Sequence, residues 1–166
     1  MPMQLNKDTQ DFKDAASKFA SGVTVVTVKT DNDFHAMTVS AFSTISMDPL
    51  LIMVCISNKS KMHDILLNHK KFSVSILEEN QGGVSSHFAG QKQPDVFGQD
   101  YGKLNVINFD ENYNIVNDAL GFFLCDLDEA YEKGDHTLFF GRVIKSQSIT
   151  TKKPLIYYSR GYSTVK

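Results

Sequence analysis

Extended segments follow one another through the second half of this chain, with few long helical stretches between them. β-Branched and aromatic residues are frequent in five such segments, at 104–109, 113–116, 120–131, 137–149 and 155–158. The sequence Glu132-Lys133-Gly134-Asp135 predicts a turn between the two longest. Strands that succeed strands in this way favour an antiparallel sheet closed into a barrel, with helices at its ends, over a parallel α/β fold.

The first half of the chain alternates short helical and extended patterns. Helical spacing of apolar residues predicts a helix at 8–21, where Phe12, Ala15, Ala16 and Phe19 share one face. Two shorter helices are predicted at 61–69 and 80–90. Extended segments are predicted at 23–30, 34–43, 50–57 and 71–78, the last of them a half-buried strand. The polar segment 91–101, which contains Pro94 and Gly98, is predicted to be a mobile loop.

Length and charge limit the class of protein. A chain of 166 residues is predicted to form a single domain over 1–166, with its core at about 10–163. The net charge of −2 argues against a nucleic-acid partner, because a general nucleic-acid surface has a basic excess. No apolar run has the length of a membrane span, and the first residues lack the pattern of a signal peptide. We therefore expect a cytoplasmic protein whose two cysteines, Cys55 and Cys125, are buried free thiols.

Several well-known catalytic motifs are missing from the sequence. It contains no G-x-G-x-x-G dinucleotide fingerprint and no G-x-S-x-G nucleophile elbow. The glycines at 98 and 102 lack the spacing and the following Ser or Thr of a phosphate-binding P-loop. The five histidines show no metal-ligand spacing and have no cysteine pair nearby, so we expect no metal site.

Three segments carry residues suited to binding a ligand, and each also has a structural interpretation. Segment 35–46 is rich in small hydroxyl residues, which could contact a planar heteroaromatic ring or could belong to an ordinary surface strand. In segment 55–62, Ser60 stands between Lys59 and Lys61 and precedes a predicted helix. It could bind a phosphate, or it could simply cap the helix. In segment 134–141, His136 follows a Gly-Asp turn where a barrel would open, and it is either functional or a tether for the turn.

Five segments together resemble one known family. They are Gly22-Val23-Thr24-Val25-Val26-Thr27, His35-Ala36-Met37-Thr38-Val39-Ser40-Ala41-Phe42, Ser46-Met47-Asp48-Pro49-Leu50, Phe88-Ala89-Gly90 and Gly134-Asp135-His136-Thr137. In this order and spacing the chain, from about Phe12 to Tyr162, resembles the flavin reductase-like domain family. Members of this family are short-chain NAD(P)H:flavin oxidoreductases that supply reduced flavin to two-component monooxygenases.

The resemblance implies a fold, an assembly, cofactors and site residues. The fold would be an antiparallel Greek-key split β-barrel of the FMN-binding type, forming a homodimer that holds FMN, or FAD, near the subunit interface. NADH or NADPH would be the reductant, and a monooxygenase component a possible partner. The isoalloxazine would be lined by Thr38, Val39, Ser40, Ala41, Phe42, Thr44 and Ile45, with further contacts from Phe88 and Ala89. Asn58, Lys59, Ser60 and Lys61 would hold the phosphate end, and catalytic His136 would lie by the nicotinamide with Tyr162 near it.

The sequence departs from the family pattern at three places. Ala36 replaces a usual glycine, a single proline stands at Pro49, and the segment 91–97 lacks an Arg-Phe pair common after Phe-Ala. Hydride transfer between two cofactors needs no protein nucleophile or metal, which agrees with the motifs that are missing. One alternative is a non-catalytic flavin- or haem-binding split-barrel module, and another is a reductase that acts directly on a different small substrate.

Overall fold

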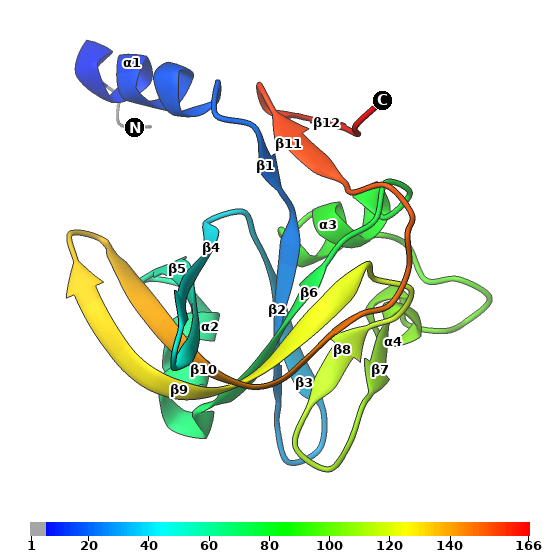
Figure 1. The fold of residues 1–166 in the computed structure, drawn as a ribbon. Helices are drawn as coiled ribbons and strands as arrows, with labels where there is room; N and C mark the ends of the chain where they lie inside the picture. Colours follow the sequence, from blue (N-terminus) through cyan, green and yellow to red (C-terminus); the bar gives the residue numbers. More distant parts are fainter. Residues whose placement is uncertain (1–5) are drawn as a thin grey trace.

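The protein is a twisted antiparallel sheet with short helices packed around it and a helical arm at one end (Figure 1). The computed structural model describes residues 6–166. The helices are α1 (Lys7–Ala16), α2 (Lys61–His69), α3 (Gly82–Phe88) and α4 (Tyr101–Asn105). The strands are β1 (Ser21–Gly22), β2 (Thr24–Lys29), β3 (Phe34–Val39), β4 (Phe42–Met47), β5 (Leu50–Ser57), β6 (Lys71–Ile76), β7 (Val106–Asn108), β8 (Asn114–Val116), β9 (Gly121–Lys133), β10 (His136–Ser148), β11 (Ile156–Tyr158) and β12 (Gly161–Ser163).

Seven strands form the main sheet in the order β3-β2-β6-β9-β10-β5-β4, and every pair is antiparallel. β3 and β4 are consecutive in the chain, yet they lie at the two opposite edges of this sheet. The barrel is therefore split between them, which confirms the predicted mainly β split barrel and corrects the closed barrel expected from strand order alone. An edge strand leaves backbone N–H and C=O groups without a neighbouring strand, so β3 has hydrogen-bonding capacity to offer.

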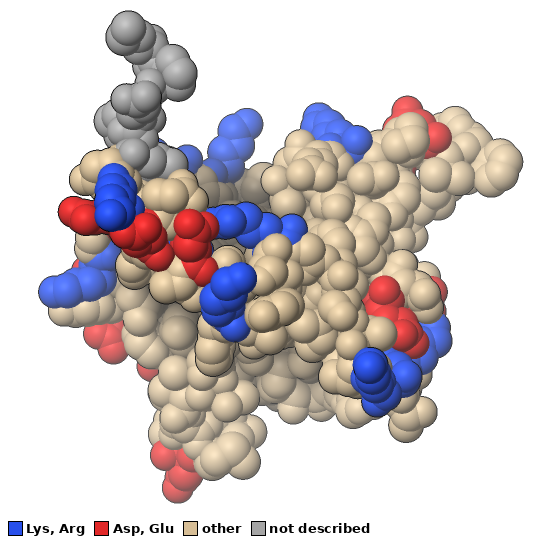
Figure 2. Space-filling model, turned by 90° about the horizontal axis from the view of Figure 1, so that it is seen from above, with Lys and Arg blue, Asp and Glu red and all other residues tan. Residues whose placement is uncertain are grey.

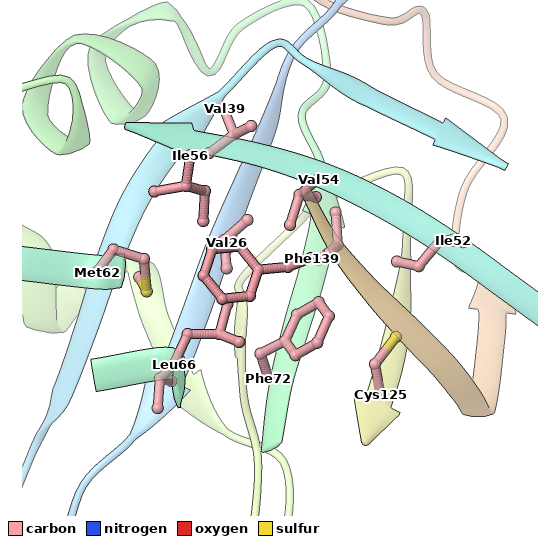
Figure 3. Packing of buried hydrophobic residues seen from close by; sticks show 12 residues of the cluster. Val26, Val39, Ile52, Val54, Ile56, Met62, Leu66, Phe72, Cys125 and Phe139 are labelled. Carbon is pink, nitrogen blue, oxygen red and sulfur yellow. The ribbon is translucent and has the colours of Figure 1, made fainter. Parts of the chain in front are cut away.

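The hydrophobic core fills the curve of this sheet and is closed by α2 (Figure 3). Val26, Val54, Phe72 and Phe139 point toward one another from four strands, and Leu66 closes the cluster from α2. This burial of aliphatic and aromatic surface is the main stabilising contribution to a barrel of this size.

Gly141 permits the close packing of β10 over this core. A Cβ atom built there would lie 2.6 Å from the ring of Phe72 and 2.9 Å from the Cβ of Cys125. The pairing with β9 shifts register between Phe140 and Gly141, where Asp128 of β9 is the extra residue. Any larger residue at position 141 would therefore displace core side chains. Cys125 is a buried free thiol as predicted, whereas Cys55 is free but only half-buried.

The N-terminal helix is shorter than its apolar periodicity predicts. α1 ends at Ala16 because the following residues turn into strand pairing, in which Ser21 and Gly22 pair with Tyr157 and Ile156. The backbone of Ser17 also accepts a hydrogen bond from the Ser159 amide. α1 has no buried residue and stands away from the barrel (Figure 1). Its Phe12 is 74% exposed, and Phe19, just beyond the helix, is 83% exposed.

Two strand predictions are wrong in detail. The predicted segment 34–43 is broken at Ser40 and Ala41 into β3 and the start of β4, because the chain there crosses from one edge of the sheet to the other. β6 was expected to be half-buried, but Ser73 and Ser75 are buried as well as the alternating apolar residues. The β7–β8 hairpin covers that face, where the Ser75 hydroxyl accepts a hydrogen bond from the Val116 amide and the Ser73 hydroxyl donates to the Asn114 carbonyl.

Local signals in the second half identify the long strands but not the short elements. α4 replaces the start of the extended segment predicted at 104–109, and Asp100 caps it by accepting hydrogen bonds from the amides of Gly102 and Lys103. β12 was not predicted at all, and it pairs with β11. The turn between β9 and β10 is the pair Gly134-Asp135, in which Gly134 has a φ of 65° that glycine adopts without strain.

The surface seen from the side of α1 mixes both signs of charge. Lysine and arginine side chains are interspersed there with aspartate and glutamate, most densely around the helical arm (Figure 2). Within residues 6–166, no helix combines the length and apolar character that a bilayer crossing requires.

Candidate functional site

A cavity of about 430 Å³ lies beside the end of β3, where the chain leaves the sheet toward β4. Thr38 and Ser40 line it from the β3–β4 junction, Ala89 from the end of α3, and Tyr162 from β12. Its other lining residues are Val23, Ser85, Ser86, Gln91, Tyr157, Arg160 and Gly161. Small-molecule sites commonly have volumes of about 300–1,000 Å³, so this cavity can hold one ring system of a ligand.

Hydroxyl groups join the three sides of this cavity. The Thr38 hydroxyl donates to the Ser85 carbonyl at 2.6 Å, which connects β3 to α3. The Ser85 hydroxyl lies 2.7 Å from the hydroxyl of Tyr162, which connects α3 to β12. Because Tyr162 is bonded through its hydroxyl, its ring is held at the cavity wall, and 44% of the residue is exposed.

A second, more apolar cavity of about 510 Å³ lies between α1 and the start of β4. Ala41, Phe42 and Met53 line one side of it, and Phe12 and Phe19 line the other. Ser40, Tyr157 and Arg160 line both cavities, so the two meet at these three residues. Together they form a groove along the open edge of the barrel, which we call the split groove.

The turn between β5 and α2 lies next to β3, on the other side of that strand. Ser60 is the N-cap of α2, and its hydroxyl accepts a hydrogen bond from the Met62 amide at 3.1 Å. The same hydroxyl lies 3.3 Å from the sulfur of Met37, which neighbours Thr38 on β3. Lys59 and Lys61 are exposed on either side of Ser60. A helix N-terminus flanked by two ammonium groups is a favourable place for an anion.

His136 begins β10 and pairs with Ser57 at the end of β5, beside that same turn. Its Nδ1 lies 2.7 Å from the carboxylate of Asp135, and its side chain is 46% exposed. The hydrogen bond from the His136 imidazole holds the pKa of Asp135 below its usual value. The backbone amide of Asn58 donates to the Asp135 carbonyl at 3.0 Å, so the β9–β10 turn is joined to the β5–α2 turn. We call these two turns, at 134–135 and 58–60, the joined turns.

The structure divides the predicted site residues into two groups on the two sides of β3. Thr38, Ser40, Ala41, Phe42, Ala89 and Tyr162 line the split groove. Asn58, Lys59, Ser60, Lys61 and His136 lie at the joined turns. His136 lines neither part of the split groove, and no hydrogen bond within residues 6–166 joins it to Tyr162. A ligand that contacts both groups would have to lie along the exposed edge of β3.

Besides the residues at the joined turns, four predicted residues line neither cavity. Val39 is buried in the core, so only its backbone is available to a ligand. Thr44 and Ile45 are exposed on β4 beyond the split groove. Phe88, the last residue of α3, packs against Phe34 of β3 with ring centroids 6.5 Å apart, and so holds the end of α3 against that strand.

Ser85, Tyr157 and Arg160 also line the split groove, and no sequence motif predicted their contribution. Ser85 was inside a predicted helix with no pattern to mark it. Tyr157 and Arg160 belong to the β11–β12 hairpin, whose turn residues Ser159 and Arg160 both have positive φ. The serine, arginine and glycine between two tyrosine-containing segments were the available signal for that hairpin.

The fold and the groove define a class of protein, namely a split barrel with a ligand-sized groove at its open edge. Comparison with known proteins identifies the family. The family model described as "Flavin reductase like domain" matches residues 16–166, and the chain belongs to this family.

Two relatives illustrate its range. The chain is 34% identical over 151 residues to the reductase component of 4-hydroxyphenylacetate 3-monooxygenase from Thermus thermophilus, covering 91% of this chain and 93% of the relative. It is 28% identical over 158 residues to the NADH-dependent flavin reductase StyB from Pseudomonas fluorescens, covering 93% of this chain and 89% of the relative.

Solved structures agree with this assignment. The flavin reductase PheA2 in its native state superposes with a TM-score of 0.84 at 34% identity, covering 95% of this chain and 97% of the other. The NADH:FAD oxidoreductase SgcE6 from Streptomyces globisporus C-1027, solved in complex with NAD and FAD fragments, has a TM-score of 0.84 at 25% identity, with 100% and 98% of the two chains covered.

Proposed function

We propose that this protein is an NADH-dependent flavin reductase. It oxidises NADH and reduces FMN or FAD, and the hydride equivalent passes from the nicotinamide to the flavin together with a proton from water. The relatives that support this assignment are named NADH-dependent flavin, FAD and FMN reductases. Anaerobic addition of NADH to the flavin-loaded protein tests it, because reduction bleaches the visible absorbance of the flavin.

The residues present suit a flavin. The observation that carries the proposal is the split groove, a ligand-sized cavity beside an edge strand. The hydrogen-bonding rim of a flavin ring can pair with free backbone groups of β3 and with the hydroxyls of Thr38 and Tyr162. The phosphate would then reach across β3 to Lys59, Ser60 and Lys61.

The protein's part in this chemistry is to position and to stabilise charge. Bound flavin and nicotinamide supply the hydride-transfer chemistry. Thr38 and Tyr162 fix the ring in the cavity, and the groove walls limit the poses in which the two rings can meet. His136 lies at the joined turns with the residues proposed for the phosphate end, and its role in this proposal is to offset the negative charge that the flavin gains on reduction.

A charge at position 60 should reveal the phosphate. Aspartate is as good an N-cap as serine, so Ser60→Asp keeps the capping of α2 but introduces a negative charge. We expect it to weaken FMN binding by about tenfold or more, since two charges a few ångströms apart repel by about 1–4 kcal/mol near a protein surface. Riboflavin, which has no phosphate, should bind as before. Fluorescence titration measures both.

Ser60→Asn is the matched control, because asparagine also caps helices and carries no charge. It should bind both flavins within about twofold of the original protein. An equal loss of FMN and riboflavin affinity in Ser60→Asp would place the phosphate elsewhere.

We further propose that the protein is a homodimer that covers the split groove. The apolar side of the helical arm is exposed at Phe12 and Phe19, and Met47 on the edge strand β4 is 83% exposed. Exposed apolar groups of this kind are typical of an interface with another molecule. Sedimentation at micromolar concentration should give a dimer, and Phe12→Glu with Phe19→Glu should shift it toward monomer. A flavin-loaded monomer of the original protein would contradict this proposal.

The reduced flavin is proposed to leave for a separate monooxygenase. Three relatives are named as reductase components of monooxygenases or hydroxylases that act on 4-hydroxyphenylacetate, resorcinol and 4-nitrophenol. The groove runs along an edge strand and not inside the barrel, so a ligand can enter and leave without unfolding of the barrel, which is what such a transfer requires.

A further inference from the structure

We propose that Thr137 and His63 are positioning residues for the flavin phosphate. Through a chain of hydrogen bonds they hold the side-chain amide of Asn58 with its NH₂ group available to the phosphate. This inference rests on the proposed function, and it adds two residues that do not touch the ligand themselves.

The hydrogen bonds connect β10, α2 and the β5–α2 turn. The Thr137 hydroxyl, at the start of β10, donates to Oδ1 of Asn58 at 2.7 Å. The same hydroxyl lies 3.2 Å from Nε2 of His63, on the first turn of α2. Thr137 is only 3% exposed, so water competes little for its hydroxyl. Buried polar groups must find their partners within the protein, which gives this small network control over local geometry.

The donor and the acceptor in each of these hydrogen bonds follow from the chemistry of the atoms. The side-chain amide nitrogen of Asn58 lies 3.5 Å from the Gly134 carbonyl oxygen. The side-chain oxygen of Asn58 cannot occupy that place, because two carbonyl oxygens are both acceptors. Oδ1 of Asn58 therefore faces Thr137, and the Thr137 hydroxyl must donate its one proton there. Toward His63 that hydroxyl can only accept. Nε2 of His63 must then carry a proton and act as the donor.

The ring of His63 is held in the orientation that this donation needs. Its side chain is 16% exposed, and its ring packs against that of Phe139 in a T-shaped arrangement, with ring centroids 5.5 Å apart at an interplanar angle of 71°. Its Nδ1 lies 2.8 Å from the carboxylate of Asp64. Each ring nitrogen therefore lies within hydrogen-bond distance of an oxygen atom, and the ring has little freedom to turn.

The consequence is an Asn58 side chain that presents donors outward. Its contact with the Gly134 carbonyl, at 3.5 Å, is at the long limit for a hydrogen bond and leaves the NH₂ group able to bind an anion. Without the Thr137 hydroxyl, only the long contact with the Gly134 carbonyl still favours this orientation, because the two ends of the amide are nearly the same shape. It could then turn its oxygen toward the phosphate and repel it.

Thr137→Val and Thr137→Ser form the decisive pair. Valine keeps the shape of threonine without the hydroxyl, whereas serine keeps the hydroxyl. We expect Thr137→Val to weaken FMN binding about 5- to 20-fold and to change riboflavin binding less than about twofold, because one charge-assisted hydrogen bond is lost. Thr137→Ser should retain the original preference for FMN. Equal losses for both flavins, or no loss in Thr137→Val, would overturn the proposal.

A second pair keeps the test decisive if Thr137→Val fails to fold. Glutamine at position 63 can place an N–H near the original Nε2, and leucine cannot. We expect His63→Leu to lose the FMN preference and His63→Gln to keep it. Equal FMN affinities in these two variants would also overturn the proposal. The proposed function has its own readout, since NADH must bleach the flavin in the original protein whatever these variants do.

Discussion

Ser40→Trp should weaken flavin binding by about 100-fold or more, which corresponds to about 2.8 kcal/mol. Ser40 lines both halves of the split groove, and it is exposed at the point where β3 ends. An indole there would fill the space that the ring system of a flavin needs, whereas a serine leaves it open. Both FMN and riboflavin should be affected, because the obstruction concerns the ring rather than the phosphate. Titration of each flavin measures the loss.

Asn68→Trp provides the control for this substitution. Asn68 is exposed on α2 and lines no part of the split groove, so it adds the same side chain without blocking the site. It should bind flavin as the original protein does. If Ser40→Trp also bound flavin normally and melted at the same temperature, the ring could not lie in this cavity.

His136→Ala should slow reduction of the bound flavin by about 10- to 100-fold and raise the KM for NADH, with little change in flavin affinity. His136 is partly exposed at the start of β10, and its side chain is bonded to Asp135. Because the reaction moves a hydride, we do not expect His136 to be an obligatory proton carrier. Its imidazole more readily orients the nicotinamide or offsets the charge gained by the flavin. Stopped-flow absorbance measures the reduction rate.

The competing interpretation is that His136 only tethers the Gly134-Asp135 turn. Two other features stabilise that turn. The Asp135 carbonyl accepts a hydrogen bond from the backbone amide of Asn58, and Gly134 adopts its positive φ without strain. Removal of the imidazole should therefore lower the melting temperature only slightly. A lowered melting temperature with an unchanged reduction rate would assign His136 a purely structural role.

Elements with a strong local signal could be predicted from the sequence to the residue. β5 and α2 have the predicted bounds because an apolar run of strand length is followed by a capping serine and a helical apolar face. The shortened α1 and the break at Ser40 depend instead on which distant strands pair with the chain. Such pairing has no signature within a few residues of sequence, so tertiary contacts decided both.

The candidate site was predictable as a set of residues but not as an arrangement. The family resemblance named Thr38, Ser40 and Ala89, and the structure brings these residues to one cavity from two places in the chain. It gave no sign that His136 and Tyr162 belong to different groups, because linear order says nothing about the side of β3 on which a residue lies. Ser85 and Arg160 were missed because each acts through tertiary placement rather than through a motif.

We propose that this split barrel passes a hydride equivalent from NADH to a flavin held along the edge of β3. The most direct measurement is the visible absorbance of the flavin-loaded protein, recorded without oxygen before and after one equivalent of NADH. We predict loss of the flavin bands together with oxidation of one NADH per flavin, and their return on admission of air. Flavin that stays oxidised while bound, with NADH unconsumed, would contradict the account and favour a non-catalytic flavin-binding module.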